Sequence, residues 1–167
     1  MKAAVKRQVS IGLGANLEDP ENQVLNAIEA LRQAAWLEGV EASSLYRSKP
    51  VGPIEQPEFI NAVCVGYTYL SEKQVLKRLN QMESDAGRLR LKRWGPRILD
   101  LDILMMSDDC FESETLQVPH PEMHKRAFVL VPLCTLRPDW LHPVSKLSVQ
   151  QMLNRLPTPL NVESIES

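Results

Sequence analysis

The sequence predicts an α+β domain in which helices flank an antiparallel β-sheet. Stretches with strand-like alternation and stretches with helical spacing follow one another in the order β-α-β-β-α-β, which is typical of a split βαβ sheet with its helices on one face. The repeated β-α-β alternation of a doubly wound parallel sheet is missing. The last third of the chain contains several prolines, so we expect it to be mostly irregular, with short elements.

Length and composition indicate one globular domain over residues 1–167, with a core of about 7–140. The chain has 167 residues, of which 44% are hydrophobic and 24% charged, and a domain commonly contains ~150 residues. These values exclude a disordered chain, a collagen-like chain and a coiled coil. The net charge of −2 and the pI of about 5.9 argue against a protein whose whole surface grips nucleic acid.

We expect a cytoplasmic protein, a monomer, with no membrane or nucleic-acid partner. The longest apolar stretch, residues 127–136, is too short to span a bilayer and contains Pro132. The basic start of the sequence is not followed by an apolar signal-peptide segment. The three cysteines are far apart and form no C-x-x-C pattern, so they indicate neither a disulfide framework nor a zinc site.

Apolar spacing, caps and turn residues define the individual elements. Asp19 before Pro20 indicates a helix N-terminus, and Ser71 with Gln74 forms a capping box. Gly12 and Gly14 complete neither a Walker A nor a G-x-G-x-x-G pattern, so we interpret them as part of a tight turn. The predicted elements are strand 9–13, helix 20–35, strand 40–46, loop 47–57, strand 60–70, a helix from Ser71 to Gly87, loop 88–97, strand 98–106, helix 148–156 and frayed residues after Pro157.

The most informative pattern is a pair of aspartates on the predicted strand 98–106. Side chains alternate between the two faces of a strand, so Asp100 and Asp102 share one face and Leu99, Leu101 and Ile103 take the other. Two carboxylates on one face repel each other unless a cation lies between them. Magnesium takes oxygen ligands, and two such ions can clamp a phosphoryl group during in-line displacement. The alternative is an ordinary exposed strand face.

The loop before these aspartates favours the functional interpretation. Residues 88–97 carry five cations and no acid, and they include Trp94. Arginine suits bidentate contacts with phosphate oxygens, and a cationic loop beside a metal-binding pair is what polyphosphate transfer needs. A solvated basic loop, offset by the two acids, is the simpler alternative.

Two further stretches contain candidate binding residues. Phe59 and Asn61 point the same way at the start of a strand and could hold a flat heterocycle, although a core Phe and a turn-capping Asn would give the same pattern. His120 and Arg126 are candidate phosphate contacts. Phe128 could sandwich the heterocycle against Phe59, or it could simply belong to the core.

Three blocks of the sequence together resemble the 6-hydroxymethyl-7,8-dihydropterin pyrophosphokinase family of folate biosynthesis. The blocks read SSLYRSKPVGPIEQPEFINAV, GRLRLKRWGPRILDLDIL and VPHPEMHKRAFVLVPL, and the resemblance covers about residues 7–140. It implies a ferredoxin-like α+β core with flanking helices. It also implies transfer of diphosphate from ATP to the hydroxymethyl group of the pterin, with release of AMP.

The resemblance also implies roles for individual residues. Asp100 and Asp102 would bind two magnesium ions, and Arg88 and Arg97 would act on the phosphates during transfer. Glu83 fits the family pattern, but no role is assigned to it. The implied ATP contacts are Arg90, Trp94, Ile103, His120, Arg126 and Asn80, and the implied pterin contacts are Ser48, Val51, Phe59, Asn61 and Phe128.

Two other functions fit parts of the same pattern. A metal-dependent phosphohydrolase could use the same two aspartates on a nucleotide, without any pterin. A small ferredoxin-like RNA-binding module could use loop 88–97, and its binding would fall steeply with salt. The acidic pI and the lack of an aromatic RNA-binding strand motif count against the second alternative.

Overall fold

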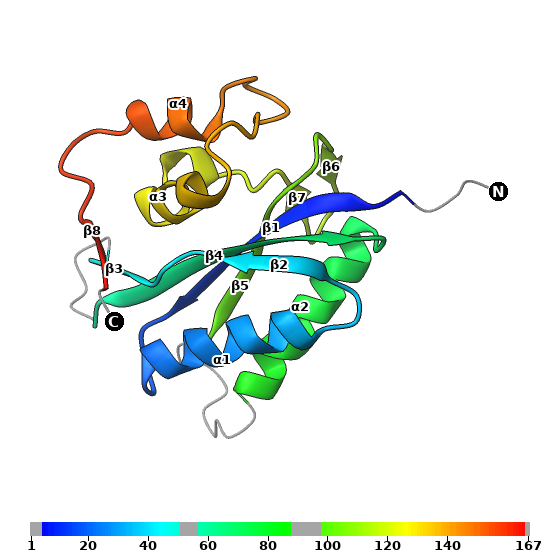
Figure 1. Cartoon of the computed structure of the whole chain (residues 1–167), viewed down its shortest axis with the longest axis horizontal. Helices are drawn as coiled ribbons and strands as arrows, with labels where there is room; N and C mark the ends of the chain where they lie inside the picture. The colour runs from blue at the N-terminus through cyan, green and yellow to red at the C-terminus, as the bar shows by residue number, and fades with distance from the viewer. Residues whose placement is uncertain (1–4, 51–56, 88–97, 166–167) are drawn as a thin grey trace.

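The structure is a computed structural model that describes residues 5–50, 57–87 and 98–165. It is a mixed α/β fold with an antiparallel sheet (Figure 1). The elements are β1 (Arg7–Ala15), α1 (Pro20–Gln33), β2 (Glu38–Ala42), β3 (Tyr46–Ser48), β4 (Phe59–Thr68), α2 (Glu72–Ala86), β5 (Asp100–Met106), β6 (Phe111–Glu112), β7 (Gln117–Val118), a 3-10 turn (Met123–Lys125), α3 (Ala127–Leu136), α4 (Val149–Asn154) and β8 (Val162–Ser164).

The main sheet has the strand order β5-β1-β4-β3-β8, and β2 also pairs with β4. Its strands pair in the antiparallel direction. Strands β6 and β7 form a separate two-stranded ribbon. Strand β1 lies between β5 and β4 and pairs with both. Its register with β5 shifts between Ser10 and Ile11, and from Ile11 to Gly14 it is continuous.

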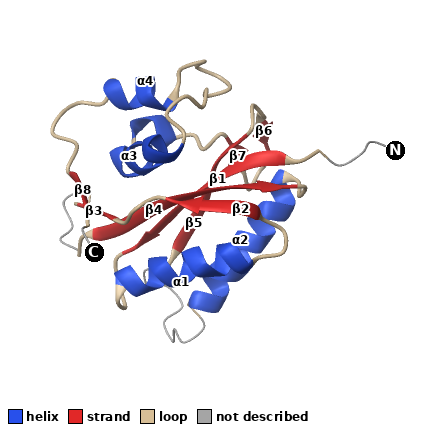
Figure 2. Cartoon of the chain, in the orientation of Figure 1, coloured by secondary structure: helices blue, strands red, loops and turns tan. Residues whose placement is uncertain are grey.

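Helices cover both faces of the sheet (Figure 2). Helices α1 and α2 lie on one face, over a core that includes Ile11, Leu31 and Leu79. Helices α3 and α4 lie on the other face, over a second core that includes Leu104 and Leu130. The sequence predicted helices on one face only, which is correct for α1 and α2 but misses α3.

Helix α3 corrects the expectation that the last third is mostly irregular. It runs from Ala127 to Leu136 with Pro132 inside it. Proline costs a helix one hydrogen bond and creates a steric clash. However, Val129, Leu130, Pro132 and Leu133 are all buried, and burial of these apolar side chains against the sheet outweighs the local loss.

The C-terminal residues are also more ordered than the sequence indicated. We expected residues after Pro157 to fray, but Val162–Ser164 form β8, which pairs with β3. Because β3 would otherwise be an edge strand, its free backbone groups provide the partners for this pairing. The Ile165 N–H donates to the Leu45 carbonyl at 2.9 Å and extends the contact by one residue.

The structure confirms both predicted capping boxes and corrects two other predictions, a helix cap and a strand. The capping boxes at Ser71 and Ser148 both form. Asp19 stands at the N-cap of α1, but its side chain makes no cap bond. The predicted strand 40–46 is in fact two strands, β2 and β3.

The three cysteines, Cys64, Cys110 and Cys134, are free. None of the helices in the described ranges is long and apolar enough to cross a membrane.

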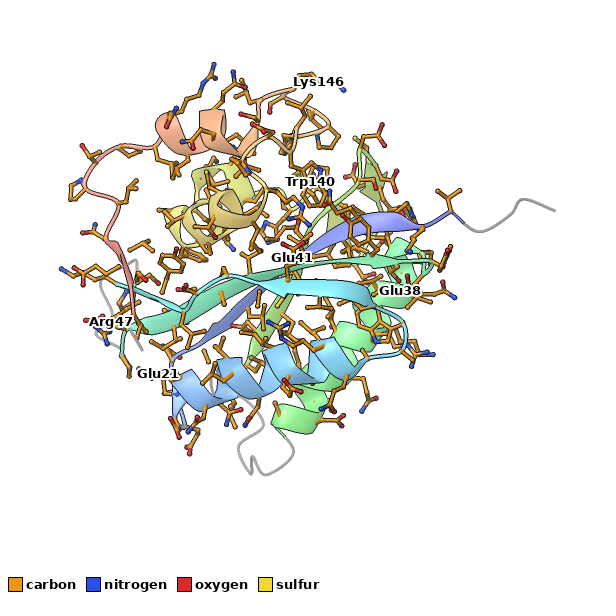
Figure 3. The ribbon with its side chains drawn as sticks, viewed as in Figure 1. Glu21, Glu38, Glu41, Arg47, Trp140 and Lys146 are labelled. Carbon is orange, nitrogen blue, oxygen red and sulfur yellow. The ribbon has the colours of Figure 1, made fainter. Side chains whose placement is uncertain are left out.

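Residues at the C-terminal end of α3 fix this helix to the sheet. Arg137 donates to the side chain of Gln8 on β1 at 2.7 Å and to Glu41 on β2 at 2.9 Å. Trp140 donates to the Ser107 carbonyl at 3.0 Å, and Figure 3 labels Glu41 and Trp140 on this side of the sheet. These bonds hold one end of α3 and thereby set where its other end, with Phe128, lies.

Arg7 joins the start of β1 to two acids from other elements. Its guanidinium contacts Glu72 on α2 at 2.8 Å and Asp109 after β5, and these side chains are largely withdrawn from water. We expect Arg7→Met to lower the free energy of unfolding by about 2–3 kcal/mol, because it leaves partly buried carboxylates without their partner. Urea denaturation measures this loss.

Arg47→Met is the matched control for this substitution. The Arg47–Glu58 pair is 3.5 Å long, its side chains are 46% and 49% exposed, and Figure 3 labels Arg47 near β3. Water and salt screen such a pair, so we expect a loss below about 1 kcal/mol. Equal losses in the two variants would contradict the structural role of Arg7.

Candidate active site

A cavity of about 720 Å³ lies on the α3 side of the sheet. Its lining combines strands β1, β3, β4 and β5 with α3 and with the segment before β8. The sequence-predicted residues that line it are Ser48, Phe59, Asn61, Asp100, Asp102, Arg126 and Phe128. The structure therefore brings together residues from three widely separated parts of the chain.

Asp100 and Asp102 occupy β5 with the alternation that the sequence predicted. Both line the cavity, whereas Leu101 between them is buried in the core on the opposite face. Asp102 is exposed and Asp100 is half-buried. A divalent cation at these carboxylates would find the oxygen ligands that magnesium prefers.

Gly12 and Gly14 line the cavity between the aspartate pair on β5 and Asn61 on β4. We call this part of the cavity surface, which has no side chains, the glycine floor. Both glycines lie within β1, and not in the turn that we expected. Gly12 pairs with Asp102 on β5, and Gly14 pairs with Asp100 on β5 and with Asn61 on β4. Because paired residues share a face, the glycines leave the sheet bare between the carboxylates and the amide.

Asn61 is held in one orientation by a neighbouring strand. The Ser48 hydroxyl on β3 donates to Asn61 Oδ1 at 2.6 Å, and both residues are buried, at 4% and 5% exposure. With its oxygen engaged, the amide presents its NH₂ donors. A Cβ on Gly14 would lie 3.1 Å from Asn61 Nδ2, which is tighter than most carbon contacts. This geometry is suited to reading the polar edge of a flat ligand.

Aromatic and cationic groups lie on the α3 side of the same cavity. Phe128 is in the first turn of α3, and the Arg126 guanidinium lies 5.6 Å from the centre of its ring. Lys125 also lines the cavity. The lining of the cavity thus combines the apolar rings of Phe59 and Phe128 with two cations, and such groups can contact a heterocycle and an anion.

His120 lines a second cavity of about 460 Å³, which His124 and His142 also line. The backbone N–H of His120 donates to the Leu104 carbonyl at 2.8 Å, and its Nδ1 accepts from the Glu122 N–H at 3.1 Å. Burial lowers the pKa of the imidazole below its usual value, and the Asp102 carboxylate acts in the opposite direction.

The remaining predicted residues are not gathered in the main cavity. The side chain of Ile103 is 3% exposed and lies in the core beneath the sheet. Asn80 is exposed on α2, the helix on the other face, and it does not line the cavity. The predictions for Val51, Arg88, Arg90, Trp94 and Arg97 fall outside the described residues.

Sequence reasoning assigned no role to Glu83, and the structure gives it a contact next to the aspartates. Its Oε2 on α2 accepts the N–H of Leu101 at 2.8 Å. Leu101 stands between Asp100 and Asp102, so this bond fixes the backbone from which both carboxylates project. Because this hydrogen bond joins α2 to β5 and depends on how the two elements pack, no local sequence signal could have identified it.

Within residues 5–50, 57–87 and 98–165 there is no group of three or more His, Cys, Asp or Glu side chains that could hold a metal ion. A magnesium ion usually keeps several waters and is bound by one or two carboxylates together with phosphate oxygens of the substrate. This is the usual situation for magnesium in sites that bind nucleotides.

Comparisons with known proteins identify the family of this chain. The family model described as 7,8-dihydro-6-hydroxymethylpterin-pyrophosphokinase (HPPK) matches residues 10–138. This chain belongs to the HPPK family. The HPPK match includes the aspartate pair of β5, the glycines of β1 and the whole of α3, but it ends before α4 and β8.

Relatives of this HPPK-family chain include two bacterial pyrophosphokinases. The 2-amino-4-hydroxy-6-hydroxymethyldihydropteridine pyrophosphokinase of Haemophilus influenzae is 43% identical over 82% of this chain and 86% of its own length. The enzyme of the same name from Pseudomonas aeruginosa is 42% identical over 80% of this chain and 82% of its own length.

A solved structure of the Plasmodium falciparum HPPK-DHPS protein has the same fold as this chain. Its TM-score is 0.72 at 16% identity, with 92% of this chain and 46% of that chain covered. This chain therefore spans less than half the length of that two-part protein, and the likeness concerns the fold alone.

The Glu83 contact can be tested without any substrate. We expect Glu83→Ala to speed hydrogen exchange of the Leu101 amide by about tenfold or more, because the amide loses its acceptor. Ser84→Ala, which changes the next residue on α2, is the control and is expected to leave this rate unchanged. An unchanged Leu101 rate in Glu83→Ala would show that Glu83 does not fix β5.

Proposed function

We propose that this protein transfers diphosphate from ATP to the hydroxymethyl group of 6-hydroxymethyl-7,8-dihydropterin and releases AMP, as a step of folate biosynthesis. The observation that carries the proposal is a single cavity lined by an aspartate pair on β5 and by an amide with two aromatic side chains on β4 and α3. Membership of the HPPK family, together with the names of the bacterial relatives, supports the same activity.

Asp100 and Asp102 are the residues we propose for two magnesium ions that accompany ATP. Bound there, the metal supplies charge neutralisation to the triphosphate. The protein itself contributes a fixed pair of carboxylates, because β5 projects both into the cavity and Glu83 holds the intervening backbone. Arg126 and Lys125 add positive charge at the same cavity.

Phe59, Asn61 and Phe128 are the residues we propose for the pterin. The two rings would stack on its faces, and the amide of Asn61, held by Ser48, would donate to its polar edge. The pterin hydroxyl oxygen then forms a bond to the β-phosphorus, loses its proton, and the bond from that phosphorus to the AMP oxygen breaks. Positioning of the two substrates accounts for much of the acceleration.

We assign Arg88 and Arg97 to the phosphates during transfer, Arg90, Trp94, Ile103, His120 and Asn80 to ATP, and Val51 to the pterin, on the family resemblance. We also propose a ferredoxin-like topology, which the order β5-β1-β4-β3 supports. We further propose a monomer and a location in the cytoplasm, and the three free cysteines support the reducing compartment.

The direct test is an AMP-release assay with ATP, magnesium and the hydroxymethyl dihydropterin. We expect AMP release to require all three components. Release of inorganic phosphate without any pterin would favour a phosphohydrolase. Salt-sensitive RNA binding without AMP release would favour the RNA-binding module.

The aspartate pair gives a prediction about activity. We expect Asp102→Asn to lower kcat by about 100-fold or more, because one of two charged oxygen ligands is lost. The melting temperature should not fall, since the substitution relieves repulsion between two carboxylates. Near-normal AMP release by this variant would contradict the metal assignment.

The glycine floor gives a prediction about substrate binding. In Gly14→Ala the new Cβ would meet Asn61 Nδ2 at 3.1 Å, while Ser48 holds that amide in place. We expect KM for the pterin to rise by about tenfold and KM for ATP to change less than about twofold.

Gly12→Ala is the comparison variant on the same strand face. The nearest atoms to its Cβ would all belong to the Leu104 side chain, and the closest of them, Cδ2, would lie at an ordinary 3.4 Å. The increase in pterin KM should therefore be clearly smaller than that of Gly14→Ala. Equal effects on the pterin would mean that crowding of Asn61 is not the cause.

A further inference from the structure

The segment between α4 and β8 forms one side of the active-site cavity. The cavity lining includes Leu156, Pro157, Pro159, Leu160, Asn161 and Val162. All six lie beyond residue 138, where the match to the HPPK family model ends. In Figure 1 this part of the chain runs from α4 past α3 to β8, which lies beside β3.

Pairing with β3 holds this segment at the cavity. Val162 is the register partner of Ser48, the residue whose hydroxyl orients Asn61. The contact continues through Ser164, which pairs with Tyr46, and through the backbone bond from Ile165 to Leu45. The C-terminal segment is thus attached to the strand that positions the amide, and Ile165 also packs against the main core.

The chemistry of the segment differs from that of the aspartate side. Leu156, Leu160 and Val162 are half-buried, and Pro157 and Pro159 restrict the backbone between them. The segment adds apolar surface to a cavity whose charged groups are Asp100, Asp102 and the cations Lys49, Lys125 and Arg126. Such a surface favours a flat, weakly polar ring system over a triphosphate.

We propose that residues 156–162 form a pterin-binding wall that selects the heterocyclic substrate. The wall removes apolar edge surface of the pterin from water beside Phe59 and Phe128, and β8 keeps it at a fixed distance from Asn61. This inference rests on the proposed function, because it names further residues that contact the same substrate.

Leu160 provides the test, since it lines the cavity and lies outside every strand and helix. We expect Leu160→Ala to raise the Kd of the pterin by about fivefold or more, measured by the fluorescence of the pterin without nucleotide. Leu160→Trp should raise it further by filling the cavity. KM for ATP should change less than about twofold in both variants.

Leu141→Ala is the matched control, because Leu141 is 53% exposed and does not line the cavity. It should leave both substrate constants unchanged. The melting temperature of each variant verifies folding, and if Leu160→Trp unfolds, the result for Leu160→Ala decides alone.

The outcomes separate this inference from the proposed function. A wild-type protein that binds no pterin and releases no AMP would refute the proposed function. A wild-type protein with full activity, together with unchanged pterin affinity in Leu160→Ala, would refute the wall alone. An equal loss of affinity for pterin and ATP would also refute it, since the wall would then act on the whole cavity.

Discussion

The arrangement of the site depends on one constraint, which is that β1 carries glycine at the two positions facing the cavity. Gly12 and Gly14 lie between β5 and β4, in register with Asp102, Asp100 and Asn61. Any larger side chain there would fill the space between the carboxylates and the amide. In the proposed function, the bare strand lets two ligands of different chemistry meet over one sheet, with phosphates toward β5 and a heterocycle toward β4.

The second requirement is that the opposite side of the cavity stays in place. Arg137 ties the end of α3 to β1 and β2, and Phe128 then faces the sheet from the start of the same helix. The pairing of β8 with β3 positions the C-terminal segment in a similar way. Both attachments join parts of the chain that are distant in sequence, so the cavity depends on the tertiary structure as a whole.

Patterns with a short period could be predicted from the sequence. The alternation of residues around Asp100 and Asp102 predicted that both face the same side of the sheet. The capping boxes at Ser71 and Ser148 could be predicted because each involves residues only three positions apart. Three features could not be predicted this way. Glycines within a strand have the same sequence pattern as glycines in a turn. Pro132 is tolerated only because its helix is buried. Strand β8 forms only because β3 offers an open edge. The contact of Glu83 with Leu101 likewise needs the packing of α2 on β5.

The central claim is that the carboxylates and the amide serve one reaction across the glycine floor. Paramagnetic broadening by Mn²⁺, added with a non-hydrolysable ATP analogue, measures it most directly in the NMR spectrum of the protein. The account predicts that the amide signals of Asp100 and Asp102 broaden first, followed by three signals from the neighbouring strands, those of Gly12 and Gly14 on β1 and of Asn61 on β4, and that Asp100→Asn and Asp102→Asn abolish this effect. Broadening centred on other acids, such as Glu72 and Asp109, with these three signals unaffected, would contradict it.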